Sequence, residues 1–217
     1  LAGLIVDLAG DDPNNIITTL TPLLYYALTV IVGLTFMVFI FYPLIIYAKT
    51  GITIKKFLKA IFPAQMLAFS TSSSAATLPL TMKRVEKNLN VSDEVTSFVC
   101  PLGATINMDG TSIHQAISAV FIAQAFGQDL TLIDQVAIVL TATLSSIGAA
   151  AVPGAGLIML VIVLGAIGID PQGLALIIAI DRPLDMLRTV VNVTGDATVA
   201  SVVASTEGEK IKYTEDE

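Results

Sequence analysis

Two long stretches of this 217-residue chain contain no charged side chain, and they limit the folds that the chain can adopt. They cover residues 13–48 and 135–169. A helix needs about 20 apolar residues to cross the hydrocarbon layer of a membrane, and both stretches are longer than that. Only 13% of the residues are charged and the mean hydropathy is +0.82, whereas about a quarter of a soluble domain is charged. The sequence therefore predicts an all-α integral membrane protein.

Charge and cysteine content exclude several other classes of protein. The net charge is −7 and the basic residues form only short clusters, so we expect no nucleic-acid partner. Cys100 is the one cysteine, which excludes a disulfide or a paired-cysteine metal site within the chain. The chain opens with apolar residues and without Met or a signal peptide. We therefore expect residues 1–10 to be the end of a helix that begins in a preceding part of a longer protein.

Two uncharged segments rich in helix breakers predict re-entrant hairpins. Residues 60–82 have Lys and Arg on both sides and a serine run, STSSS, in the middle. Basic residues favour the cytoplasmic face, so a segment with both ends there must return to the face that it left. Residues 135–169 are flanked by aspartates and contain SSIGAAAVPGAG, where Gly and Pro interrupt a helix. This predicts a second hairpin that enters from the opposite face.

The predicted order of segments has an internal symmetry. It runs through a transmembrane helix (16–48), hairpin 1 (60–82), a helix (95–126), hairpin 2 (135–169), a helix (172–205) and a cytoplasmic tail (206–217). Two hairpin–helix units of opposite orientation are typical of secondary transporters, which bind substrate near mid-membrane where the interruptions meet. The predicted fold is thus an inverted-repeat transporter with two re-entrant helical hairpins and two interrupted transmembrane helices.

The last predicted helix carries polar residues at helical spacing. They fall within an arc of about 80° and are Asp181, Asp185, Arg188, Asn192 and Asp196. A charge at the bilayer centre costs about 2.5–3.5 kcal/mol on insertion scales, so such residues usually face an interior site. An Asp185–Arg188 ion pair that joins helices is the structural alternative, but it leaves Asn192 and Asp196 unexplained. A guanidinium suits a carboxylate, an aspartate suits an ammonium, and Asn and Asp oxygens suit a cation.

The motif GATINMDGT, residues 103–111, predicts a second polar site on the helix 95–126. It carries Asn107, Asp109 and Thr111 in a stretch without Lys or Arg. Gly103 and Gly110 permit local unwinding, which frees backbone carbonyls to face a cation. The alternative is a kinked helix in which a neighbouring group satisfies the aspartate.

Four motifs, STSSSAATLP, GATINMDGT, SIGAAAVPGAG and DMLRTVVNVTGD, together give the chain its resemblance to a known family. In this order the chain resembles the dicarboxylate/amino acid:cation symporters, which include excitatory amino acid transporters and archaeal aspartate transporters. The resemblance implies a multi-pass protein of the cell membrane whose mobile transport domain this chain forms. It also implies a homotrimer, held together through scaffold helices that lie outside this chain.

The resemblance implies an acidic amino acid substrate, L-aspartate or L-glutamate. Its ammonium would pair with Asp185 and its side-chain carboxylate with Arg188. The other implied contacts come from both hairpins and both polar helices. These residues are Ser73, Ser74, Thr111, Val152, Gly156, Thr189 and Asn192.

Sodium is the co-transported cation that the resemblance implies, with no organic cofactor. One ion is expected at the side chains of Asn192 and Asp196 and the carbonyls of Gly103 and Asn107. A second is expected among Thr105, the hairpin 2 carbonyls near Ser146, Ile147 and Ala149, and the sulfur of Met108. A third would use Asn107 and Asp109, with its remaining ligands on a helix outside this chain.

The chain departs from the family pattern near the expected substrate site. Archaeal relatives have an arginine where this chain has Ser72, and animal relatives have one where it has Met186; Arg182, one turn earlier, is a candidate substitute. Gln115 replaces a glutamate that the animal relatives use in proton coupling, which favours coupling to sodium alone. His114 is expected to be a packed, hydrogen-bonded histidine.

These observations predict a transporter and not an enzyme, since the serine run has no base in a clear motif context and His114 is the only histidine. The predicted function is sodium-driven uptake of aspartate or glutamate by an alternating-access movement. The alternatives are a proton-coupled carrier, or a neutral amino acid or dicarboxylate carrier, of the same family.

Overall fold

Every regular element in the part of the chain that the structure describes, residues 13–215, is a helix in this computed structural model. The predicted helix end at 1–10 lies outside the described residues, as do the last two residues of the tail. The elements are α2 (Pro13–Phe36), η1 (Met37–Phe41), α3 (Tyr42–Thr50), α4 (Ile54–Thr71), α5 (Ser74–Leu89), α6 (Asp93–Ile106), α7 (Asp109–Ala125), α8 (Leu132–Ile147), α9 (Ala155–Ala166), η2 (Pro171–Leu176) and α10 (Ile178–Thr206).

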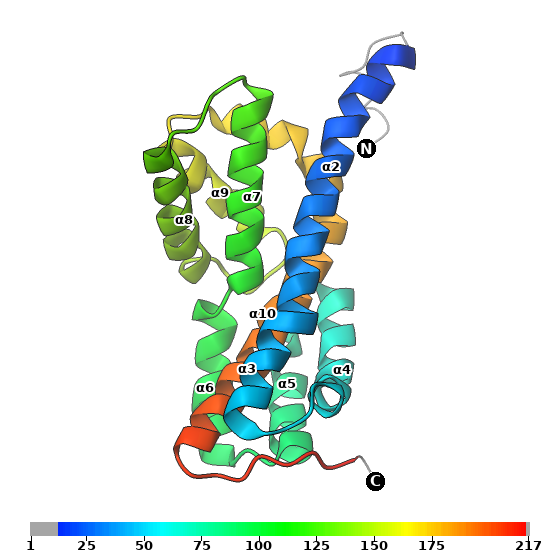
Figure 1. Cartoon of the computed structure of the whole chain (residues 1–217), viewed down its shortest axis with the longest axis vertical. Helices are drawn as coiled ribbons and strands as arrows, with labels where there is room; N and C mark the ends of the chain where they lie inside the picture. The colour runs from blue at the N-terminus through cyan, green and yellow to red at the C-terminus, as the bar shows by residue number, and fades with distance from the viewer. Residues whose placement is uncertain (1–12, 216–217) are drawn as a thin grey trace.

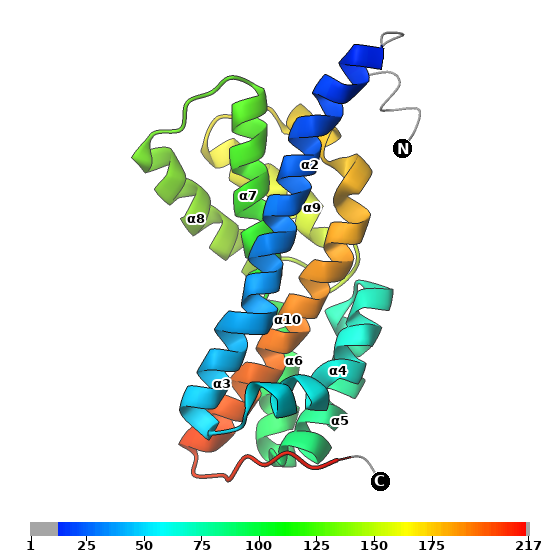
Figure 2. The ribbon, with the colours of Figure 1, turned by 45° about the vertical axis from the view of Figure 1, so that its right-hand side comes forward.

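Two long helical columns run side by side along the molecule (Figures 1 and 2). One consists of α2, the π-helical turn η1 and α3, and the other is α10. The pair α4–α5 lies beside the lower part of these columns, and the pair α8–α9 lies at the upper part. Because α10 packs against α2 to α7 and against α9, its side chains are buried on most of its circumference.

Among the described residues, one helical run, Leu20–Thr50, is both long and apolar enough to cross a membrane. Large apolar side chains such as Leu24, Tyr25 and Val32 are exposed along it. The helices Leu132–Ile147 and Ala155–Ala166 are also apolar but shorter.

Each of the two helix pairs has a non-helical tip, and the two tips touch. Ser72 and Ser73 separate α4 from α5, and residues 148–154 separate α8 from α9. The Ser73 hydroxyl donates to the carbonyl of Ala151 at 2.8 Å, and the amide of Ala75 donates to the same carbonyl at 3.3 Å. The predicted re-entry of these pairs into a membrane stays a prediction.

The start of α4 lies earlier than the predicted hairpin boundary. Its first turns contain Lys55, Lys56 and Lys59, all exposed, while Phe57 and Ala60 are buried against the protein. The residues before the predicted hairpin 60–82 therefore form the start of an amphipathic helix, because their apolar side chains recur at helical spacing.

The two helices that were predicted to be interrupted differ. A break at Asn107 and Met108 separates α6 from α7. The predicted helix 172–205 instead consists of a 3₁₀ turn followed by α10, which is continuous over 29 residues, so no break lies beside its polar side chains. Its Gly195 serves close packing and not unwinding, because a Cβ there would lie 2.7 Å from the Tyr42 hydroxyl oxygen. The irregular backbone lies before the helix, in the 3₁₀ turn η2.

The apolar core is divided between the two ends of the molecule. One cluster joins α2, α7, α8, α9 and the first part of α10, and another joins α3, α4, α5, α6 and the last part of α10. Between them α10 buries a series of polar side chains, from Asp181 to Asp196. Buried polar groups need partners, and those partners define the candidate site.

Candidate binding site for a charged substrate and cations

A small cavity lies where the two hairpin tips meet α7 and α10. Its volume is about 10 Å³, roughly the space of one water molecule. It is lined by Ser72, Ser74, Met108, Thr111, Ala149, Ala150, Ala151, Val152, Gly156, Asp185, Thr189 and Asn192. A site for an organic ligand is usually at least about 300 Å³, so this cavity must open before it can admit one.

Most of the predicted substrate residues line this cavity, and the other two lie at its border. Ser73 is held by its bond to the Ala151 carbonyl. Arg188 lies behind Gly156, where a Cβ would come within 2.9 Å of both the Arg188 Nη1 and the Thr111 Cγ2. Only glycine fits at this position without displacing either side chain.

Arg188 is completely buried and has partners on several sides. Its Nη2 lies 3.0 Å from Asp181 Oδ1 and 2.9 Å from Asp185 Oδ1. Its Nη1 donates to His114 Nδ1 at 2.8 Å. Within the described part of the chain its Nε has no hydrogen-bond partner. The guanidinium is therefore compensated in charge, and it keeps a donor that is free for a further acceptor.

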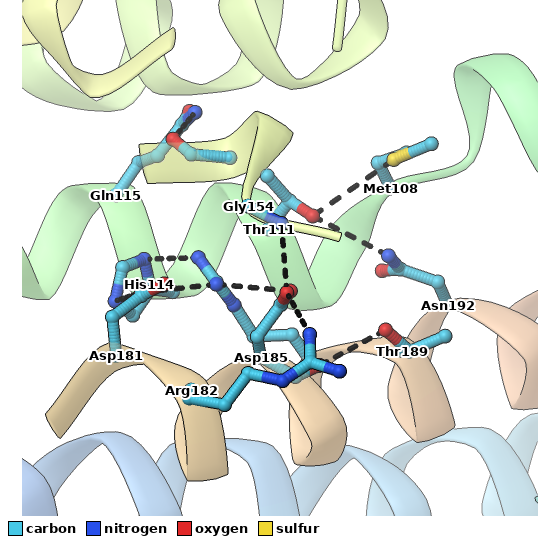
Figure 3. Close-up of polar contacts among 12 residues, drawn as sticks. Met108, Thr111, His114, Gln115, Gly154, Asp181, Arg182, Asp185, Thr189 and Asn192 are labelled. Atoms are coloured by element: carbon cyan, nitrogen blue, oxygen red, sulfur yellow. Dashed lines mark hydrogen bonds and ion pairs between the residues drawn. The ribbon is translucent and has the colours of Figure 1, made fainter. Parts of the chain in front are cut away.

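Asp185 connects the arginine to the tip of α8–α9. While one oxygen faces Arg188, the other accepts the backbone N–H of Gly154 at 2.9 Å. The guanidinium of Arg182, which is exposed, lies 3.7 Å from that second oxygen. Figure 3 shows Arg182 and Gly154 on different sides of this carboxylate. Asp185 thus contacts both the tip between α8 and α9 and a second arginine, Arg182.

The helix α7 forms the opposite wall of the site. The Asn192 amide donates to the Thr111 hydroxyl at 3.3 Å, and the Gly110 N–H donates to the Asn192 side-chain oxygen at 2.9 Å. Gln115, also buried, donates to the Gly156 carbonyl at 3.0 Å and accepts the Ser145 hydroxyl at 2.6 Å. These bonds fix α7 to α10 and to both arms of the α8–α9 pair.

Two carboxylates lie at the other end of the polar face. Asp196 is buried and accepts the side-chain amide of Asn107 at 3.0 Å, and Asp109 accepts the Tyr42 hydroxyl at 2.5 Å. Backbone comes close to Asp196 at Gly103, where a Cβ would lie 2.5 Å from Oδ1. None of the salt bridges among the described residues joins either carboxylate to a lysine or arginine.

The groups around Asp196 and Asp109 have the chemistry that a hard cation prefers. Carboxylate, amide and backbone carbonyl oxygens are the ligands that such cations take, and a buried carboxylate without a basic partner is costly. Across residues 13–215 no cluster of three His, Cys, Asp or Glu side chains exists, so the geometry does not indicate a transition-metal centre.

A comparison with known protein families identifies the family of this chain. The model of the sodium:dicarboxylate symporter family matches residues 1–206. The chain belongs to this family. Its relatives are transporters, so the prediction that the chain is not an enzyme agrees with the family assignment.

The chain is also similar to excitatory amino acid transporters of animals. The chain is 45% identical over 190 residues to an excitatory amino acid transporter of Caenorhabditis elegans, which covers 88% of this chain and 38% of that protein. It is 47% identical to excitatory amino acid transporter 2 of Mus musculus, over 82% of this chain and 31% of the relative. It is 41% identical to excitatory amino acid transporter 5 of the mouse, over 94% of this chain and 36% of the relative. The chain thus spans about a third of the length of these relatives.

The second predicted cation set stays a prediction, and its residues differ in their surroundings. Met108 and Ala149 line the cavity, but Thr105 and Ile147 are exposed. The Ser146 carbonyl accepts the Ala149 amide at 3.2 Å.

Several residues of the site were not predicted as site residues. Ser72 lines the cavity in a left-handed conformation, φ 53°, and its buried hydroxyl has no partner among the described residues. His114 and Asp181 hold Arg188, and Tyr42 holds Asp109. A signal existed for His114 and Asp181, since they lie three residues after Thr111 and four before Asp185, on the same helical faces.

Proposed function

We propose that the chain forms the substrate- and cation-binding part of a sodium-coupled symporter for acidic amino acids. One observation carries this proposal: a carboxylate, Asp185, and a fully buried guanidinium, Arg188, meet at one cavity, and the guanidinium keeps a free Nε–H. L-Aspartate and L-glutamate have the complementary groups, an ammonium and a side-chain carboxylate. Each buried charge of the ligand then finds an opposite charge in the protein, as desolvation requires.

In this proposal, substrate binding exchanges one ion pair for two. The ligand ammonium takes the place of Arg188 beside Asp185, and the ligand carboxylate takes the place of Asp185 beside Arg188. Meanwhile Arg188 keeps Asp181 and His114 as partners, which hold the guanidinium in position during the exchange. The hydroxyls and amides of Ser74, Thr111 and Asn192 remain for the ligand's second carboxylate.

Opening of the tip gives the route to the cavity. Two contacts close it in this structure: the Gly154 N–H bond to Asp185 and the bond between Ser73 and the Ala151 carbonyl. Because the ligand ammonium competes for Asp185, its entry requires the Gly154 contact to be released or rearranged. We infer that such movements of the two tips, on opposite sides of the site, underlie alternating access across a cell membrane in a trimer of longer chains.

Sodium supplies the missing positive charge beside Asp196 and Asp109 in this proposal. The oxygens of Asn107, Asn192 and Asp196 would bind one ion. Since Asn192 also contacts Thr111 and Gly110, cation binding orders the α7 wall of the substrate cavity. Linkage then requires sodium and substrate to raise each other's affinity by the same factor.

The test is the affinity for aspartate measured by calorimetry on the full-length protein across a sodium titration, with choline holding ionic strength constant. We expect affinity to rise steeply with sodium. Affinity that does not change with sodium but changes with pH would contradict sodium coupling and favour a proton-coupled carrier. Equal affinities for succinate and aspartate would contradict the ammonium-binding role of Asp185, and would favour a dicarboxylate carrier.

A further inference from the structure

His114 occupies a position directly behind the substrate arginine. It lies on α7, its side chain is completely buried, and its Nδ1 is 2.8 Å from the Arg188 Nη1. Its other nitrogen, Nε2, lies 2.8 Å from the Tyr26 hydroxyl and 3.3 Å from the Ser118 hydroxyl. Asp181 Oδ1 is 3.5 Å from Nε2. The proposed function above assigns no ligand contact to this histidine.

The contact with arginine determines the protonation of the ring. A guanidinium has only donors, so Nδ1 must present its lone pair to Arg188. The proton of the neutral ring is then on Nε2, from which it is donated to Tyr26. The Tyr26 hydroxyl in turn donates to Ser118 at 2.8 Å. A chain of hydrogen bonds thus leads from the Arg188 Nη1 through His114 to Tyr26 on α2 and on to Ser118.

A neutral acceptor differs from the two carboxylates that also hold Arg188. Asp181 and Asp185 orient the guanidinium but also compensate its charge. His114 orients it without cancelling any charge, so the electrostatic attraction for an incoming carboxylate is kept. Orientation of a binding group before the ligand arrives lowers the cost of binding.

We propose that neutral His114 is a positioning residue for Arg188, and that it determines affinity for substrates with a side-chain carboxylate. This inference rests on the proposed function, because it assigns the carboxylate to Arg188. The Nε2–H tautomer, anchored by Tyr26, keeps the Arg188 Nη1 in place behind Gly156, where it borders the cavity. A proton added to Nδ1 removes the acceptor and places a second positive charge against the guanidinium.

The charged and titratable groups around the ring come from two neighbouring helices. Tyr26 faces it from α2, and Asp181 and Arg188 face it from α10, with Asp185 on the far side of the guanidinium. The other elements packed against α7 contribute no such group. Within their described ranges, α9 and η2 contain no charged residue, and the one acidic residue of α8, Asp134, caps its own first turn with Thr131. A pH effect on Arg188 that His114 causes is therefore separable by substitution of His114.

Two variants of the full-length protein separate positioning from packing. His114→Phe keeps a ring of similar shape but has no acceptor. In His114→Asn the side-chain oxygen occupies the bond position of Nδ1 and still accepts, but it does not titrate. At saturating sodium we expect the Phe variant to lose about 10-fold or more in aspartate affinity, because a buried charged donor loses its acceptor. We expect the Asn variant to keep most of the affinity.

The pH profile gives a readout that a packing role would not change. For the unmodified protein, we expect aspartate affinity at saturating sodium to fall through a one-proton step on acidification, and this step should be absent in His114→Asn. Sodium binding without substrate, at a site that does not contact His114, checks that both variants are folded. Unchanged aspartate affinity in the Phe variant, or an identical acid step in the Asn variant, would overturn the inference. If the unmodified protein binds no acidic amino acid at any sodium concentration, the proposed function itself fails.

Discussion

The two halves of the polar face on α10 differ in how their buried charges are paired. In the first half Asp181 and Asp185 each form an ion pair with Arg188, at 3.0 and 2.9 Å. In the second half Asp196 has an amide, Asn107, as its hydrogen-bond partner, and no basic side chain of the described residues pairs with it. The charges of the first half are compensated by the protein itself, whereas Asp196 in the second half has no basic partner among the described residues.

In the proposed function, this difference allows one helix to bind two kinds of ligand. An ion pair in the low-dielectric interior is stable only while both partners are present, so a zwitterionic ligand that replaces each partner can enter at little electrostatic cost. A lone buried carboxylate instead attracts a cation. Both halves meet at Asn192, which contacts Gly110 and Thr111 on α7. Substitutions in each half should therefore affect different ligands.

The largest effect is expected for Arg188→Cys. It leaves Asp181 and Asp185 buried without their main counter-charge, and a ligand carboxylate without its partner. Removal of one member of a buried ion pair costs about 3–5 kcal/mol, so aspartate affinity should fall by at least about 100-fold. Calorimetry with aspartate and with serine measures this, because a neutral amino acid does not need the guanidinium. Unchanged aspartate affinity would exclude the assigned role.

Asp185→Asn should have the next largest effect. The amide keeps an acceptor for the Gly154 N–H but loses the charge that faces an ammonium, while Asp181 still holds Arg188. A hydrogen bond to a charged group contributes about 1.5–3 kcal/mol, which corresponds to a loss of about 10- to 100-fold in aspartate affinity. Sodium binding in the absence of substrate, measured on the same sample, should change much less. Comparable losses for both ligands would contradict the separation of the two halves.

Some of this arrangement follows from the sequence and some of it cannot. The spacing of charges from Asp181 to Asp196 predicts one polar face, and serine, glycine and proline runs predict where helices are interrupted. The contact of His114 with Arg188 joins residues 74 positions apart, so it depends on how α7 packs on α10, which helical periodicity does not encode. The role of Gly195 depends on packing in the same way, because a Cβ there would lie 2.7 Å from the Tyr42 hydroxyl oxygen on α3.

In the cation half, Asp196→Asn should change the sodium requirement. The substitution keeps the oxygen that accepts from Asn107 but removes the charge that binds the ion. We expect the sodium concentration for half-maximal aspartate binding to rise about 10-fold, as for an allosteric coupling of about 1–3 kcal/mol, with little change in aspartate affinity at saturating sodium. The exposed Asp129→Asn is the matched control. An equal shift in both variants would show a general effect of charge and not a cation site.

The smallest effect is expected for Arg182→Ala. This variant tests whether Arg182 belongs to the group of ion-paired residues in the first half of the polar face. Arg182 lies 3.7 Å from Asp185, but its side chain is 58% exposed. An exposed ion pair contributes about 0–1 kcal/mol, so aspartate affinity should fall by less than about five-fold. Because salt screens exposed charges far more than buried ones, the difference from the unmodified protein should disappear when choline chloride is raised at fixed sodium. A loss as large as that of Arg188→Cys, or one that salt does not reduce, would show that Arg182 acts as a second buried arginine of the site.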